Sequence, residues 1–198
     1  MTKTKSTFLP AALATLMLST SAVPAVSASW LRLGQETSRP YGHVDYCRRH
    51  AADCTRRKSR GSLPPARLST LKQVNVAVNR AIKPVSDQAQ YGRLEVWNAS
   101  ATAGDCEDYA LQKRAQLLHR GFRPEDLLLA MTNTGSDYHT VLVVRTRLGD
   151  FVLDNLTDAV LPVSESRLDF IKVQSPAHGG NWLRAMGEMT TAPKPAAT

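Results

Sequence analysis

The chain is poor in cysteine, in aromatic residues and in long apolar runs. Only three of its 198 residues are cysteines, and 6% are aromatic. Neither a CxxC pair nor a paired set of histidines is present, which excludes the common structural zinc sites. No segment beyond residue 28 reaches the roughly 20 apolar residues that a membrane-spanning helix needs. The sequence therefore predicts one globular domain with few cysteines, each of which needs an explanation.

The first 28 residues have the pattern of a secretory signal peptide. Lys3 and Lys5 precede a short apolar stretch, 8–18, and Val26-Ser27-Ala28 is a small-x-small cleavage pattern. The alternative, an uncleaved membrane anchor, is disfavoured because the stretch is short and interrupted. We expect 1–28 to be removed, 29–189 to form the domain and 190–198 to be a disordered tail. The predicted location is the periplasm or the exterior of the cell.

Basic residues outnumber acidic ones, 25 to 17, and give a formal net charge of +8. The excess is spread along the chain, so nucleic acid is not an expected partner. The one dense cluster is Arg-Arg-Lys-Ser-Arg at 56–60. No aromatic residues accompany it, so a solvated loop is favoured over a phosphate-binding site.

Export changes how the cysteines are interpreted, because oxidising compartments allow disulfides. Cys47 and Cys54 have six residues between them and are predicted to pair. So short a loop contributes about 2 kcal/mol on the chain-entropy model. Cys106 is then the odd thiol.

Two helices and a hairpin are predicted around this thiol. Thr70 and Gln73 form a capping-box pattern before an apolar stripe, and Pro84 ends that helix. A second helix begins at Cys106, with Asp105 as its capping residue, and stops at Gly121. The continuously apolar run 127–131 suits a buried strand, and the segments 139–145 and 151–156 flank a turn at 148–150 as an antiparallel hairpin.

The order of Cys106, His139 and Asp154 suits a thiol nucleophile, its base and an orienting carboxylate. A thiol attacks acyl carbon as thiolate, so it needs a helix N-terminus or similar place and an imidazole to accept its proton. A simple turn at Leu148 and Gly149 pairs Asp154 with Val143, about 13 Å along the strand from His139. A triad therefore requires a shifted turn, a bulge or strong twist.

These residues resemble the bacterial transglutaminase-like cysteine peptidases, whose best-described members are the LapG-type periplasmic proteases of biofilm control. The resemblance rests on 104–110 (GDCEDYA), 139–142 (HTVL) and 152–156 (VLDNL), and covers most of the chain after the signal peptide. It implies a papain-like α+β fold, in which a cysteine at a helix N-terminus packs on an antiparallel sheet that carries the histidine and aspartate. Cys106, His139 and Asp154 would be the nucleophile, base and orienting residue.

Three carboxylates flank the thiol: Asp105, Glu107 and Asp108. Their charges raise the pKa of a thiol unless something offsets them. The resemblance implies calcium bound by these residues, because LapG-type enzymes depend on it. The alternative is that acids simply favour a helix N-terminus. Three acids supply too few oxygens for calcium, so carbonyl groups or water would have to complete the site.

Proteolysis is the predicted activity, but the same scaffold also supports other outcomes. The resemblance implies that the substrate is the N-terminal region of a large surface adhesin, cut beside an Ala-Ala pair, and that an inner-membrane receptor sequesters the protease. The first alternative is transglutaminase-like acyl transfer or deamidation in the cell envelope. The second is a non-catalytic envelope binding module, which thiol reactivity would distinguish from an enzyme.

Overall fold

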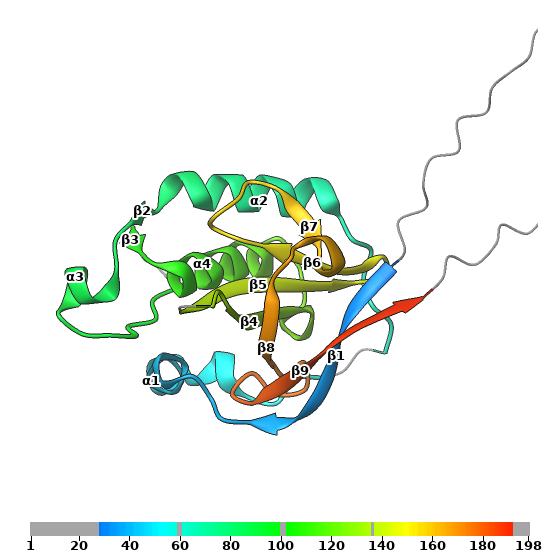
Figure 1. The fold of residues 1–198 in the computed structure, drawn as a ribbon, viewed down its shortest axis with the longest axis horizontal. Helices are drawn as coiled ribbons and strands as arrows, with labels where there is room; N and C mark the ends of the chain where they lie inside the picture. Colours follow the sequence, from blue (N-terminus) through cyan, green and yellow to red (C-terminus); the bar gives the residue numbers. More distant parts are fainter. Residues whose placement is uncertain (1–27, 59–60, 100–101, 136, 192–198) are drawn as a thin grey trace, which may run out of the picture.

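The computed structural model describes residues 28–58, 61–99, 102–135 and 137–191. Apart from Ala28, the predicted signal peptide lies outside the described residues. Seven strands form one antiparallel sheet in the order β1-β9-β8-β4-β5-β6-β7 (Figure 1). The elements in chain order are β1 (Ala28–Thr37), α1 (Tyr41–Arg49), η1 (Ala51–Cys54), α2 (Leu68–Ala81), β2 (Lys83–Pro84), α3 (Asp87–Tyr91), β3 (Ala103–Gly104), α4 (Cys106–His119), η2 (Pro124–Asp126), β4 (Leu127–Asn133), β5 (Tyr138–Thr146), β6 (Gly149–Leu153), β7 (Val160–Pro162), η3 (Val163–Glu165), β8 (Asp169–Gln174) and β9 (Trp182–Thr191).

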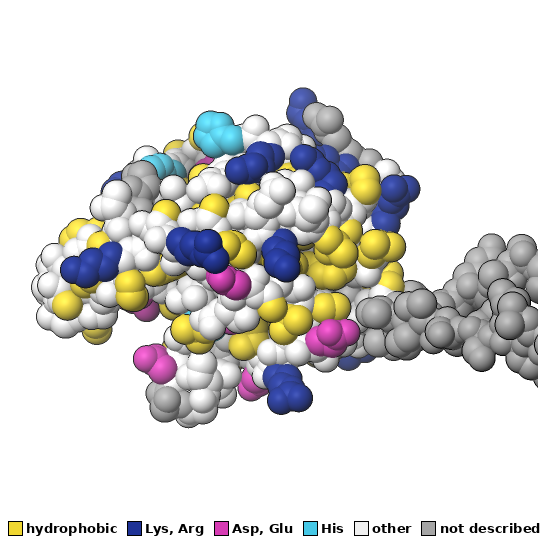
Figure 2. All heavy atoms as spheres, turned by 90° about the horizontal axis from the view of Figure 1, so that it is seen from above, with side chains coloured by type: hydrophobic (Ala, Val, Ile, Leu, Met, Phe, Trp, Pro, Cys, Tyr) yellow, Lys and Arg dark blue, Asp and Glu magenta, His cyan; other side chains and the backbone are white. Residues whose placement is uncertain are grey.

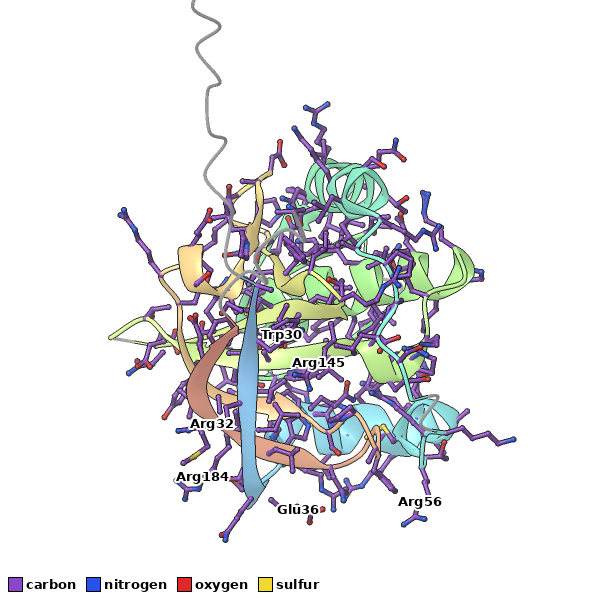
Figure 3. All side chains as sticks on the ribbon, turned by 90° about the vertical axis from the view of Figure 1, so that its right-hand side faces the viewer. Trp30, Arg32, Glu36, Arg56, Arg145 and Arg184 are labelled. Atoms are coloured by element: carbon purple, nitrogen blue, oxygen red, sulfur yellow. A yellow bond between two sulfur atoms is a disulfide. The ribbon has the colours of Figure 1, made fainter. Side chains whose placement is uncertain are left out.

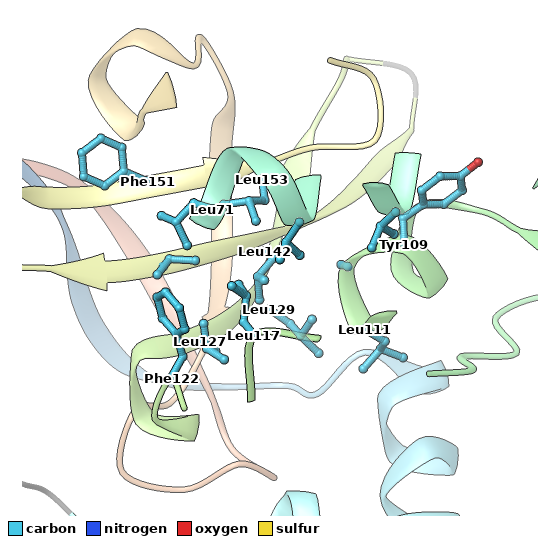
Figure 4. Close-up of a cluster of buried hydrophobic side chains, with 14 of the residues drawn as sticks. Leu71, Tyr109, Leu111, Leu117, Phe122, Leu127, Leu129, Leu142, Phe151 and Leu153 are labelled. Atoms are coloured by element: carbon cyan, nitrogen blue, oxygen red, sulfur yellow. The ribbon is translucent and has the colours of Figure 1, made fainter. Parts of the chain in front are cut away.

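Strand β4 is buried on both faces. Leu127 and Leu129 belong to the apolar cluster between the sheet and helices α2 and α4 (Figure 4). Leu128 and Ala130 belong to a second cluster, on the opposite face of the sheet. Because successive side chains of a strand point to opposite faces, a strand buried on both sides is an uninterrupted apolar run. The predicted buried strand at 127–131 is confirmed, as is the α+β fold with α4 packed on an antiparallel sheet.

The sheet curls so that β1 returns to the β5–β6 hairpin (Figure 3). The Trp30 indole donates to the Thr146 carbonyl at 2.9 Å, and the Leu31 N–H donates to Asp150 Oδ2 at 2.9 Å. Arg145 Nε donates to the other Asp150 oxygen at 3.2 Å. Burial nevertheless raises the pKa of Asp150 to about 6. These contacts close the second apolar cluster under β1.

Helix α2 begins earlier than the capping pattern predicts. Its N-cap is Arg67, with φ +47° and no side-chain capping bond, so the expected cap at Thr70 is wrong. Arg67 instead lies over the Phe122 ring at 4.4 Å and donates to the Arg120 carbonyl at 3.1 Å. This tertiary contact overrides the local signal. The other end is as predicted, because the helix stops before Pro84.

Helix α4 begins at Cys106 as predicted. At its other end Gly121 has φ +79° and donates to the Leu118 carbonyl, while Phe122 donates to the Leu117 carbonyl. This pair of hydrogen bonds is a Schellman motif, which favours glycine at the position with left-handed backbone conformation. Asp105 is the N-cap residue as predicted, but the expected capping bond from its carboxylate is wrong, because that side chain makes none.

Strands β1 and β9 carry the ends of the described chain. Ser29 pairs with Thr190 and Ala28 with Thr191, so the last strand runs two residues beyond the boundary expected at 189. The rest of the predicted tail, 192–198, lies outside the described residues. Within the described ranges, no helix is both long and apolar enough to traverse a bilayer.

The predicted disulfide joins Cys47 and Cys54, with an S–S distance of 2.05 Å. It links the end of α1 to η1. Basic side chains are dispersed over the face that is seen from above in Figure 2, among apolar and neutral ones. The solvated loop expected at 56–60 is only partly correct, because Arg57 is buried.

Candidate active site

Cys106 is the first residue of α4, and its thiol is half-buried. The Thr140 backbone N–H, on β5, donates to Sγ at 3.3 Å, and the thiol donates to Glu107 Oε2 at 3.3 Å. Burial, and then the Glu107 carboxylate, raise the pKa of the thiol. The helix makes its first bond from the Tyr109 N–H to the Asp105 carbonyl, so the helix itself gives the Cys106 N–H no acceptor.

His139 and Asp154 meet at the end of the β5–β6 hairpin. His139 Nε2 lies 2.8 Å from Asp154 Oδ1, and the Leu156 N–H donates to the same oxygen at 3.0 Å. Burial acts to raise the pKa of Asp154, but these two hydrogen bonds hold it below its usual value. His139 Nδ1 has no hydrogen-bond partner among the described residues.

The hairpin reaches this geometry through a shifted turn. Thr146 pairs with Gly149, and its side chain accepts from the Leu148 N–H at 3.1 Å and donates to the Gly149 carbonyl at 2.7 Å. Leu153 therefore pairs with Leu142, and Asp154 comes next, opposite Val141. The predicted pairing of Asp154 with Val143 is wrong. A diagonal neighbour in a sheet is about 7 Å away, within reach of an imidazole and a carboxylate.

Helix α2 holds the loop after Asp154. Asn79 Nδ2 lies 3.1 Å from the carbonyl oxygens of both Asp154 and Thr157, and Asn75 Nδ2 donates to the Thr157 carbonyl at 2.8 Å. Residues four apart in a helix lie on the same face, so the two amides act on one loop. The sequence alone gives neither asparagine a role at the site, because the carbonyl groups that the two amides bond lie about 80 residues further along the chain.

Cys106 and His139 line one cavity of about 810 Å³. Three apolar side chains on its rim are strongly exposed: Leu94 (70%), Tyr138 (65%) and Leu156 (74%). The described lining residues include five carboxylates and no lysine or arginine, although the chain is basic. Exposed apolar residues around a concave site are typical of ligand-binding surfaces.

Three of the carboxylates form a cluster: Asp87, Asp105 and Glu107 have oxygens that lie within 4.8 Å of one another. Asp105 Oδ2 accepts from the Asp87 N–H at 3.0 Å, whereas both Oδ1 atoms are buried without a partner among the described residues. Burial, followed by the neighbouring Asp105, raises the pKa of Glu107 to about 10. A cluster of buried carboxyl groups with unpartnered oxygens is suited to bind a cation.

Asp87 was not predicted from the sequence, and Asp108 lies outside the cluster. The Asp108 side chain accepts from the Asn98 N–H at 2.7 Å. Its other oxygen lies against the Cα of Gly104, where a Cβ atom would come within 1.9 Å of it. Of the three predicted ligands, the structure therefore brings together Asp105 and Glu107, with Asp87 as the third member.

Comparison with known proteins identifies the family. The family model for bacterial transglutaminase-like cysteine proteinases matches residues 33–189. The chain belongs to this family. It is a cysteine peptidase with a transglutaminase-like fold, as the sequence motifs predicted. No curated protein matches it.

Among solved structures, this peptidase is similar to LapG from Legionella pneumophila. Calcium-bound LapG is 23% identical, with a TM-score of 0.49 over 58% of this chain and 67% of that one. EGTA-treated LapG is 20% identical, with a TM-score of 0.48 over 63% of this chain and 71% of that one.

A lysine of the peptidase is buried on the same helix as the thiol. Lys113 is fully buried, and its Nζ has no hydrogen-bond partner among the described residues. Burial lowers the pKa of Lys113 to about 7, against the attraction of Asp154 and Asp158. In return, its charge helps to keep Asp154 ionised. The sequence gives no signal for this residue, since a lysine on a helix is usually solvated.

Proposed function

We propose that Cys106 is the nucleophile of this peptidase, His139 its general base and Asp154 the residue that orients the imidazole. The 2.8 Å contact between His139 and Asp154, beside the cavity that also contains Cys106, carries the proposal. Asp154 fixes the proton on Nε2 and leaves Nδ1 as the base. An orienting carboxylate also stabilises the imidazolium when it forms.

The reaction then follows the usual course of acyl transfer to sulfur. His139 Nδ1 takes the thiol proton, and Sγ attacks the carbonyl carbon of the scissile peptide to form a tetrahedral intermediate. The imidazolium returns the proton to the leaving amine as the C–N bond breaks, which leaves a thioester on Cys106. Water, deprotonated by His139, hydrolyses the thioester and restores the thiol.

We further propose that Asp87, Asp105 and Glu107 hold a calcium ion. Their chemistry fits, because calcium prefers carboxylate oxygens and the buried, unpartnered Oδ1 atoms of both aspartates are free to bind it. Bound there, calcium would offset the negative charge next to the thiol. Backbone carbonyls or water would have to complete the coordination.

The proposed substrate is an exported protein, a surface adhesin cut near its N-terminus, with the peptidase in the periplasm or outside the cell. The disulfide supports export, since such bonds persist in oxidising compartments. An extended segment with small side chains at the scissile bond suits a cavity with apolar side chains on its rim. Control of the protease by an inner-membrane receptor is part of the same proposal.

The test is cleavage of an adhesin N-terminal fragment that contains an Ala-Ala pair. Mature protein is incubated with it in calcium or in a chelator, and Cys106→Ala is the blank. We expect cleavage only by the wild type and only when calcium is present. Cleavage by Cys106→Ala would refute the assigned nucleophile, and cleavage that persists under chelation would refute the calcium requirement. Amine incorporation into a glutamine donor, without cleavage, would favour acyl transfer, and failure of Cys106 to react with an alkylating reagent would favour a binding module.

A further inference from the structure

A second cavity, of about 520 Å³, shares none of its lining residues with the one that contains Cys106. It lies where the segment after η1 meets α4 and η2. Five basic residues line it: Arg56, Arg57, Lys58, Arg114 and Arg123. Among the described lining residues, two are acids, Asp53 and Glu125. The cavity therefore has a formal charge of +3, and nothing in the proposed peptidase chemistry uses it.

Two of these guanidinium groups are buried and incompletely paired. Arg57 is 9% exposed and Arg114 3% exposed. Arg57 Nη1 donates to the Ser175 carbonyl at 3.4 Å, while Nη2 has no hydrogen-bond partner among the described residues. Arg114 Nη1 lies 3.4 Å from Asp53 Oδ2, and its Nε is likewise unpartnered within the described ranges. Buried charged donors are costly unless they are hydrogen-bonded.

The two acids do not balance this charge. Asp53 Oδ2 also accepts from the Tyr46 hydroxyl at 2.5 Å, so its lone pairs are shared. Glu125 lies 3.6 Å from Arg123 Nε, and Arg123 has a closer partner in Asp126, outside the cavity. Burial and then the nearby Arg114 lower the pKa of Arg57 to about 10. The charges in the cavity repel one another in the absence of an anion.

The backbone fixes Arg57 in this position. Its N–H donates to the Ala177 carbonyl at 2.9 Å, and Arg56 forms an isolated β-bridge with His178. The segment is therefore attached to the loop before β9, and these bonds hold the Arg57 backbone beside the cavity. Arg56 remains exposed beside it, at the lower right of Figure 3.

We propose that this cavity binds a phosphate group. The planar guanidinium fork matches phosphate oxygens with paired N–H donors. A phosphate monoester dianion offsets two of the three positive charges, and a phospholipid phosphodiester offsets one. The volume admits a phosphate ester rather than the bare ion alone. The phosphate group can belong to a soluble monoester or to the headgroup of an anionic phospholipid.

The first test is calorimetric titration of the mature protein with methyl phosphate, in a phosphate-free buffer of fixed ionic strength. We expect saturable binding of one equivalent. Arg57→Gln is expected to weaken it at least tenfold, and the exposed Lys58→Gln about two- to fivefold, as for a solvated charge. The matched control, Arg80→Gln on the outer face of α2, is expected to leave the dissociation constant unchanged.

Lys58→Gln keeps the test decisive if Arg57→Gln fails to fold, because Lys58 is exposed and its loss does not disturb the core. Co-sedimentation with phosphatidylglycerol vesicles, against phosphatidylcholine vesicles, then distinguishes the sources. Sedimentation with the anionic vesicles that methyl phosphate abolishes indicates a lipid headgroup; methyl phosphate binding without it indicates a soluble ester. No saturable binding of either probe, or equal binding by wild type and both cavity variants, would overturn the proposal.

Discussion

Asp87→Asn is the sharpest perturbation of the carboxylate cluster, because it removes one charge and almost no volume. Asp87 Oδ2 accepts from the Val96 N–H, and an asparagine oxygen can keep that bond. The changed atom is Oδ1, which is buried and unpartnered among the described residues. The variant therefore tests the charge of the cluster while the bond from the Val96 N–H is kept.

The expected effect has opposite signs with and without calcium. At free calcium ten times the dissociation constant, binding adds about 1.4 kcal/mol of stability, or about 3 to 6 °C in Tm for a domain of this size. Loss of one of three carboxylate ligands is expected to weaken binding at least tenfold, which reduces that shift to about 1 to 2 °C. In chelator, the variant amide donates to a neighbouring carboxylate instead of repelling it, and Tm is expected to rise by about 1 to 6 °C.

Thermal unfolding in calcium and in chelator measures both effects. Asp137→Asn is the matched control, because Asp137 lines the same cavity outside the cluster and accepts from the Tyr138 N–H at 2.7 Å. It is expected to keep the calcium shift of the wild type, as is Asp108→Asn. A full calcium shift in Asp87→Asn would refute the assignment of Asp87 as a ligand, and loss of the shift in Asp108→Asn would restore the ligand set that the sequence alone predicted.

Three further predictions concern the groups around His139. Asp154→Asn is expected to lower kcat about 10⁴-fold. Because folding lowers the pKa of Asp154, the variant should also be less stable than the wild type above about pH 4, and this difference in unfolding free energy should vanish on acidification. Asn79→Ala should lower kcat more than Gln73→Ala, an exposed control, with the fold retained on circular dichroism. Lys113→Met should raise Tm, most below pH 7 and less as pH rises towards 10, because folding lowers the pKa of this lysine; an equal gain at all pH values would contradict a buried ammonium.

Local patterns predicted the elements that carry the site. The apolar run at 127–131 and the glycine stop at Gly121 depend on neighbours in sequence, and both appear as expected. The start of α4 at Cys106 is a signal of the same kind. By contrast, the start of α2 depends on the contact of Arg67 with Phe122, which local capping rules do not include.

The cation cluster was only half predictable, for a reason of geometry. Asp105 and Glu107 flank the thiol and draw attention by proximity. Consecutive helix residues point in different directions, so Asp108 turns from its neighbour Glu107 towards the Asn98 backbone. Asp87 enters from α3, 18 residues before Asp105 along the chain. A sequence without structure cannot give that approach.

The hairpin register could be restricted but not determined from the sequence. Both strands of the hairpin were predicted, although β6 covers Gly149–Leu153 instead of 151–156. The need for a shifted turn followed from the rise per residue. The side chain of Thr146 decides the shift, because it bonds both Leu148 and Gly149 within the turn. A shift of one position in the turn moved the Asp154 partner by two residues, from Val143 to Val141. That change makes the contact between Asp154 and His139 possible.

Helix α4 connects the two sites proposed for this peptidase and keeps them apart. Its first turn carries Cys106 and Glu107, and Arg114 lies about 12 Å further along the axis, on the wall of the basic cavity. Acids near the N-terminus and cations towards the C-terminus also suit the helix dipole. Because one rigid helix carries residues of both sites, a phosphate bound at Arg114 can stabilise α4 without contacting the thiol. The increases in Tm caused by calcium and by phosphate should therefore be additive.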